Sequence, residues 1–173
     1  MNKNTSSILK SVTKPGRYSG GEYGQIIKDK KDIKARFAFC FPDTYEIGMS
    51  NLGMRILYGV LNEENDVWCE RVYNPWIDMQ EKMKENDIPL TACESGDPLS
   101  DFDMIGFTLQ YEMSYTNVLN MLDLAKIPLR AADRDDSMPI VIGGGPCAYN
   151  PEPVADFFDL FNIGEGEEML PEL

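Results

Sequence analysis

Short apolar blocks separated by polar turns run along the chain and predict strands and helices in alternation. Residues 33–41 form the first such block, with Phe37 and Phe39 on one side and Ala38 and Cys40 on the other. A strand that is apolar on both sides is buried on both faces, which is typical of a parallel sheet covered by helices. The first block therefore predicts a central strand.

Later blocks continue this pattern. Further strands are predicted at residues 67–72, 90–93, 104–109, 139–142 and 159–163. Helices of about three turns are expected between the strands, with predicted starts at Ser50 or Asn51, at Pro75, and at Ser114 or Thr116. Strands that alternate with helices predict an α/β fold with a doubly wound, mostly parallel sheet in a three-layer sandwich.

The two ends of the chain differ from this pattern. We expect residues 1–32 to form an N-terminal arm. Residues 1–13 are polar and expected to be loose. The rest of the arm is rich in glycine and has tyrosines that either pack on the domain or await a partner. We expect residues 33–173 to form the α/β domain. The last helix has only begun where the sequence stops, so we expect a further domain downstream that holds the chemistry.

Charge and composition exclude several functions. The chain has 16 Lys and Arg against 29 Asp and Glu, a net charge of −13, which argues against direct nucleic-acid binding by this region. It has no histidine, so no Ser-His-Asp arrangement can form. The four cysteines are scattered, which favours free thiols, two of them buried, over zinc or disulfides. With no signal peptide and no apolar run of membrane-spanning length, we expect a cytoplasmic protein away from membranes.

Ligands of open parallel sheets bind beyond the carboxyl ends of the strands. The loops expected at that edge are 42–51, 110–114, 143–150 and 164–167. In the third loop, Gly143, Gly144 and Gly145 precede Pro146 and let a backbone approach a ligand closely, although a tight turn explains them equally well. The loop matches neither phosphate-binding glycine motif.

Carboxylates in two other loops have two interpretations each. Glu165 and Glu167 precede an expected helix, where they either favour its start or contact a cationic group. Asp43 and Glu46 either cap the next helix or do acid/base work.

An aromatic group follows the predicted strand 104–109. Tyr111, Glu112, Met113 and Tyr115 either offer a flat platform for a ring system or pack at a domain interface.

Three motifs together resemble the N-terminal region of radical S-adenosylmethionine (radical SAM) proteins that carry a B12-binding-like domain. Residues 144–152 match the form GGPxxxxPE, residues 164–168 read Gly-Glu-Gly-Glu-Glu, and residues 14–23 look like the start of one branch of that family. The resemblance implies a cobalamin-binding-like, or flavodoxin-like, fold.

The resemblance also implies a set of cofactor-binding residues, and this chain departs from the set at one position. Base-off cobalamin domains carry DxHxxG after the first strand, and here Asp43 and Gly48 keep that spacing while Tyr45 stands in place of the histidine. Thr108 occupies the place of the family's serine. The resemblance thus implies no cobalt ligation by this loop, and it leaves base-on or ligand-free cobalamin binding open.

A radical SAM cluster needs CxxxCxxC, which this chain lacks. The resemblance therefore implies that the 4Fe-4S cluster and S-adenosylmethionine belong to a downstream barrel. This region would cover the barrel and help bind substrate or corrinoid without being catalytic itself. Two alternatives stay open: a stand-alone flavodoxin-like module that binds a flavin or nucleotide, and an acidic protein-interaction domain.

Overall fold

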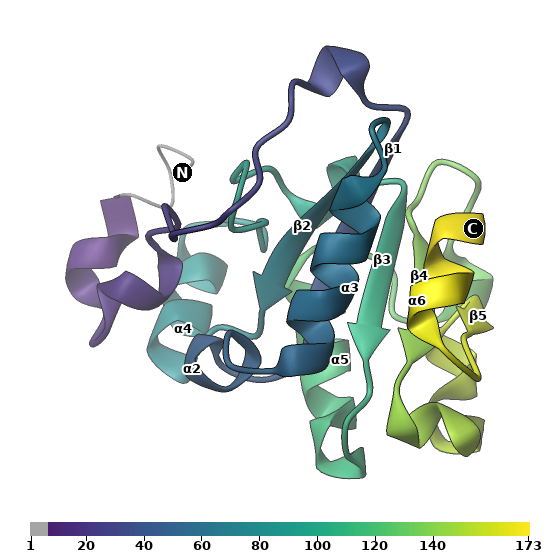
Figure 1. Ribbon diagram of the computed structural model, residues 1–173. Helices are drawn as coiled ribbons and strands as arrows, with labels where there is room; N and C mark the ends of the chain where they lie inside the picture. The colour runs from purple at the N-terminus through teal and green to yellow at the C-terminus, as the bar shows by residue number, and fades with distance from the viewer. Residues whose placement is uncertain (1–6) are drawn as a thin grey trace.

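Five parallel strands form one sheet in the order β2-β1-β3-β4-β5 (Figure 1). The structure, a computed structural model, describes residues 7–173. The strands are β1 Ala35–Phe41, β2 Val67–Tyr73, β3 Met104–Thr108, β4 Ile140–Gly144 and β5 Leu160–Phe161. The predicted doubly wound α/β fold is confirmed.

Helices cover both faces of this sheet. The short α2 (Tyr45–Gly48) follows β1, and α3 (Leu52–Glu63) and the C-terminal α6 (Gly166–Met169) pack on one face, here called the α3 face. The other face, the α5 face, carries α4 (Ile77–Glu85) and α5 (Tyr115–Leu124). The connection after β1 thus covers one face and the connection after β3 covers the other, which makes the β1–β3 boundary the point where the winding reverses.

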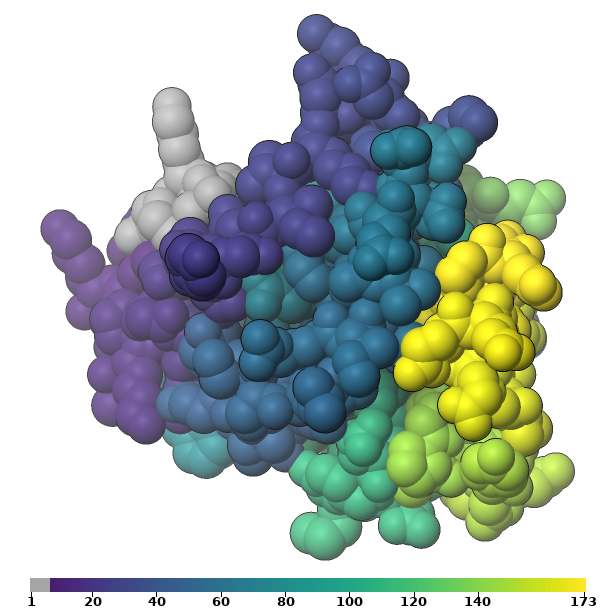
Figure 2. Space-filling model, viewed as in Figure 1, coloured from purple at the N-terminus to yellow at the C-terminus, as the bar shows by residue number. Residues whose placement is uncertain are grey.

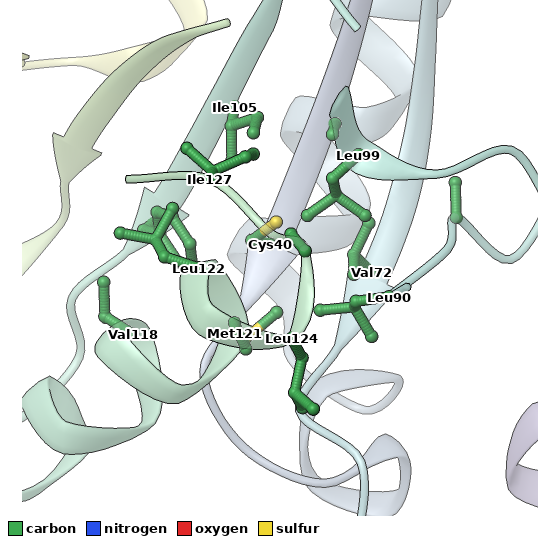
Figure 3. Close-up of a cluster of buried hydrophobic side chains, with 14 of the residues drawn as sticks. Cys40, Val72, Leu90, Leu99, Ile105, Val118, Met121, Leu122, Leu124 and Ile127 are labelled. Carbon is green, nitrogen blue, oxygen red and sulfur yellow. The ribbon is translucent and has the colours of Figure 1, made fainter. Parts of the chain in front are cut away.

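Alternate residues of β1 feed two separate cores. Phe37, Phe39 and Phe41 pack with residues of α3 on the α3 face. Ala38 and Cys40 point to the α5 face, where Figure 3 shows Cys40 beside side chains from β2, β3 and α5. Both faces of β1 are therefore buried, as the apolar residues on both sides of this strand predicted.

The predicted third strand at residues 90–93 is wrong. This segment forms only an isolated antiparallel bridge between Thr91 and Pro98. The next residues instead cap the outer edge of β2: the Cys93 amide donates to the Arg71 carbonyl (2.9 Å), and Glu94 accepts from the Arg71 amide and from its Nε (both 2.7 Å). A side chain occupies the edge where another strand would pair.

The three-turn helix expected between β4 and β5 is also absent. That connection consists of the 3-10 turns Pro146–Tyr149 and Glu152–Phe157. Pro151 and Pro153 cannot donate backbone hydrogen bonds, so the segment cannot continue as an α-helix.

The N-terminal arm is packed where it is described. Ile8 and Val12 are buried in the core of the α5 face, so the expectation of a loose segment is wrong for residues 7–13, and residues 1–6 lie outside the described part. The Tyr18 hydroxyl accepts a hydrogen bond from the Trp76 amide at 3.0 Å, whereas Tyr23 is fully exposed. Only the first of the two tyrosines anchors the arm.

All four cysteines are free, and Cys40 and Cys69 are buried as expected. Between residues 7 and 173, no helix is long and apolar enough to cross a membrane.

Candidate functional site

A cavity of about 190 Å³ lies on the α3 face, between α3 and the C-terminal segment that contains α6. Figure 2 shows these two segments, in blue and yellow, on neighbouring parts of the surface. The floor comes from the middle of the strands, with Phe37, Phe39, Gly106 and Ile142. The cavity therefore runs from the sheet surface toward the carboxyl ends of β3 and β4.

A glycine inside β3, Gly106, lets the Phe37 ring lie close to the strand at the floor of the cavity. A Cβ at Gly106 would lie 2.4 Å from the Phe37 ring, so the ring occupies the space where a side chain would stand. Sequence reasoning missed this residue. An isolated glycine within a predicted strand is the signal that could have found it, because such glycines mark close approaches.

The rim is built from the ends of β3 and β4. Gln110 Nε2 donates to Thr108 Oγ1 at 2.5 Å, and the Leu109 amide donates to the Gly144 carbonyl at 2.7 Å. Gly145 has φ +94°, and a Cβ there would lie 3.2 Å from the backbone of Leu109. The structure thus brings Thr108, Gly144 and Gly145 together, as the sequence predicted, and adds Gln110.

Carboxylates form the outer rim. Glu165 and Glu167 are exposed and line the cavity beside Gly164, which has φ +146°. Within the part of the chain that the structure describes, no Lys or Arg lines this cavity. The rim therefore offers hydroxyl, amide, backbone and carboxylate groups. Its carboxylates would repel the negative charge of a phosphate.

Three of the predicted residues do not line this cavity. A Cβ at Gly143 would lie 2.8 Å from the Phe161 ring, which places this glycine against an aromatic cluster away from the cavity. A Cβ at Gly48 would lie 2.5 Å from the Tyr73 ring. Pro146 opens a 3-10 turn and does not line the cavity. Packing explains both glycines.

Asp43 lies at the point where the winding reverses. Its Oδ1 accepts from the Thr44 amide at 2.6 Å, and its Oδ2 accepts a short hydrogen bond from the Tyr111 hydroxyl. This bond raises the pKa of Tyr111 to about 12. Glu46 has other partners, because Arg17 Nε and Lys14 Nζ donate to it at 2.9 and 3.3 Å. The two carboxylates are therefore bound by different partners.

Tyr45 does not line the cavity beside β3 and β4. Its ring packs edge-on against Tyr73, with centroids 5.3 Å apart and planes at 83°, and it lines a separate cavity near the end of β2. Burial is the main cause that raises the pKa of Tyr45 to about 12. The Tyr45 side chain is thus held by an aromatic neighbour.

Large apolar side chains are exposed after each of the five strands, including Trp76 and Ile77 after β2. We give the name carboxyl-edge apolar residues to those after the other four strands: Ile47 and Leu52 after β1, Met113 after β3, Tyr149 after β4 and Ile163 after β5. Met113 is 86% exposed and Tyr149 74%. Exposed apolar groups that gather at one part of a surface are typical of regions that contact a partner.

The described residues hold no cluster suited to a metal. Residues 7–173 contain no group of three or more Cys, Asp or Glu side chains arranged to hold a metal ion. Burial raises the pKa of the Cys40 and Cys69 thiols, which keeps them protonated and poor ligands.

Comparison with known proteins gives two matches. The chain is 29% identical over 132 residues to an uncharacterized protein of Methanocaldococcus jannaschii, and the match covers 75% of this chain and 24% of that protein. The chain thus spans about a quarter of the length of this relative. The profile of the family described as "Radical SAM proteins, N-terminal" matches residues 53–173, well over half of the chain. The chain therefore belongs to the family of N-terminal regions of radical SAM proteins.

Proposed function

We propose that this region is an accessory domain that docks on a linked radical SAM catalytic domain and holds part of a substrate or corrinoid in the cavity between α3 and α6. S-adenosylmethionine and the 4Fe-4S cluster would be bound by the linked domain. The domain itself would position the ligand and exclude water from it.

The cavity is the observation that carries this proposal. Its rim at Thr108, Gly144 and Gly145 lies at the carboxyl ends of parallel strands, the edge at which α/β sheets bind ligands. Its apolar floor and few polar rim groups are typical of small-molecule sites. Because no Lys or Arg among residues 7–173 lines the cavity, an uncharged part of a ligand is favoured over the phosphate of a flavin or nucleotide.

The carboxyl-edge apolar residues support docking by the same edge. Met113 and Tyr149 stand on loops that follow β3 and β4, next to the cavity rim. A partner that covers these side chains would also close the cavity mouth. The relative's length, about four times the matched region, leaves ample chain for such a partner domain.

A corrinoid with a protein ligand on cobalt does not fit these residues. The chain has no histidine, and Tyr45 packs against Tyr73 at the other cavity. The proposal is therefore limited to a corrinoid that keeps its own lower base or has none.

Hydrogen exchange tests the docking. Amides of this chain alone would be compared with the same amides in a longer protein that includes the radical SAM domain. We expect slower exchange at 110–114, 146–150 and 164–167 in the longer protein, and unchanged exchange near Asp87 and Lys126 at the opposite end of the sheet. Equal exchange at the carboxyl edge in both proteins would reject the proposed arrangement.

A further inference from the structure

The loops that follow the five strands contain no basic residue. They comprise residues 42–51, 74–76, 109–114, 145–152 and 162–165, and they lie at the end of the sheet to which the strand arrows point in Figure 1. The sequence after Arg134 has no Lys or Arg at all, although the whole chain has 16. The edge at which docking is proposed is thus without basic groups in its own loops.

Four glutamates at this edge are exposed and have no basic partner. Among residues 7–173, none of these four forms an ion pair, and they are Glu112, Glu152, Glu165 and Glu167. Ion pairs do form at the other end of the strands. There Asp66 pairs with Lys34 at 2.8 Å. Asp159, just before β5, pairs with Arg134 at 3.1 Å.

The adjoining segments bring few basic groups to this edge. Lys14 and Arg17 of the N-terminal arm both bind Glu46, at 3.3 and 2.9 Å. Arg55 is exposed in the first turn of α3. Acidic groups therefore outnumber basic ones at the carboxyl ends of the strands, and this part of the surface is negatively charged.

The unpaired glutamates stand beside the carboxyl-edge apolar residues. Glu112 directly precedes the exposed Met113, and Glu152 follows the exposed Tyr149 by three residues. Protein–protein interfaces combine an apolar centre with a polar rim, and both kinds of group occur together on these loops. The charge of the rim then determines which partner surface is complementary to it.

We propose that the linked radical SAM catalytic domain meets this edge with an apolar surface bordered by Lys and Arg side chains. This inference rests on the proposed docking and adds the chemistry of the partner's face. A second copy of the chain would bring the same carboxylates to the contact, and a nucleic acid would bring phosphates, so repulsion disfavours both. The attraction of opposite charges would orient the two domains before their apolar groups meet.

The salt dependence of docking in the longer protein tests this charge complementarity. Salt screens attraction between exposed charges, because the Debye length falls from about 10 Å at 0.1 M to about 3 Å at 1 M. The measurement is hydrogen exchange at amides 110–114 and 147–150, with the isolated chain as the reference at each concentration of NaCl. We expect the protection in the longer protein to fall about fivefold over this range, as the loss of several weak, exposed ion pairs would produce.

Charge-reversal variants of the longer protein locate the effect. Glu112→Lys combined with Glu152→Lys should lower the protection in dilute salt and reduce its dependence on salt. The matched control is Asp101→Lys combined with Asp136→Lys, which changes the net charge equally at exposed positions near the amino ends of β3 and β4. The control should keep the wild-type protection. Circular dichroism and the melting temperature of the same variants of the isolated chain show whether each one is folded.

The outcomes separate this inference from the docking itself. Protection that is present but independent of salt would overturn the inference and leave the docking in place. Equal loss of protection in the two double variants would also overturn it, because the charge of the whole chain would then be responsible. Exchange that is the same in the longer protein and the isolated chain in dilute salt would reject the docking, and this inference with it.

Discussion

The Tyr111 hydroxyl donates a short hydrogen bond to Asp43 Oδ2 and so joins the loop after β1 to the loop after β3. These loops flank the point where the winding of the sheet reverses. Asn117 Nδ2 adds a second link by donating to the Pro42 carbonyl at 2.9 Å. The aspartate of the loop after β1 is thus bound by a tyrosine of the loop after β3.

The first prediction concerns the titration of Tyr111. Its deprotonation would place a phenolate beside the Asp43 carboxylate, which is why the pKa is raised to about 12. Asp43→Asn should move that pKa toward the ordinary value of about 10. Absorbance of tyrosinate against pH measures the change, and Tyr111→Phe identifies which titration is lost. A pKa near 12 in Asp43→Asn would contradict the assigned cause.

The same bond gives an alkaline pH dependence. Because the folded pKa lies above the unfolded one, the stabilisation from Tyr111 is complete below pH 10 and is lost as the pH rises through about 12. Urea unfolding between pH 9 and 12 should therefore show a smaller loss of stability in Tyr111→Phe than in the wild-type chain. An identical pH dependence of the two proteins would show that this group does not contribute.

Two glycine substitutions should have opposite effects on stability. Gly106→Ala places a Cβ 2.4 Å from the Phe37 ring and should lower the free energy of unfolding by about 1–3 kcal/mol. Gly59→Ala meets nothing within 4 Å and lies inside α3, so it should raise that free energy by about 0.5–1 kcal/mol. Urea unfolding measures both, and a neutral Gly106→Ala would mean that the floor of the cavity is not rigid.

The last turns of α4 and α5 offer a test of backbone strain. Asp87 and Lys126, directly after these helices, have φ of 56° and 61°, values that favour glycine. The amides of Lys126 and Ile127 donate to carbonyls of the preceding turn, both at 3.0 Å, which fixes this conformation. Lys126→Gly should be about 1 kcal/mol more stable to urea than Lys126→Ala. Both variants lose the ion pair with Asp87, so their difference reports the backbone alone.

The sequence predicted those elements that depend on local pattern. The strands around Phe37 and Ile105 and the helix after Asn51 are where apolar spacing and capping placed them, and Asn51 Oδ1 accepts from the Met54 amide at 2.9 Å. The strand predicted at 90–93 failed because Leu90 and Ala92 are buried in the core of the α5 face without joining the sheet, and Glu94 bonds the edge of β2 in place of a strand. Such a contact between distant segments leaves no local periodicity.

The candidate site was predictable only in part, for a similar reason. The rule that ligands bind at carboxyl ends placed Thr108, Gly144 and Gly145 correctly at one edge. The cavity behind them needs the gap between α3 and α6 and the close approach of the Phe37 ring to Gly106, which arise only when distant segments pack.

Iron–sulfur reconstitution tests the assignment of the cluster to another domain. The four cysteines do not form a cluster site, and burial raises the pKa of Cys40 and Cys69. After anaerobic reconstitution, this chain should hold far less than one 4Fe-4S cluster per molecule by iron and sulfide analysis. The longer protein with the radical SAM domain is the positive control. A stoichiometric cluster on the 173-residue chain would contradict the assignment of the cluster to another domain.

The final prediction concerns Tyr45, which stands where base-off cobalamin domains carry a histidine. Tyr45→His should not create a cobalt ligand, because this side chain packs against Tyr73 and lines the cavity near β2, whereas the proposed ligand lies beside Thr108 and Gly144. Cobinamide, which has no lower base of its own, is the appropriate probe. Paramagnetic resonance of its reduced cobalt(II) form should show no nitrogen coupling with Tyr45→His or with the matched Tyr45→Phe. Coupling to one nitrogen in Tyr45→His alone would mean that the loop after β1 can turn toward the cavity, and a protein-ligated corrinoid would then fit this fold.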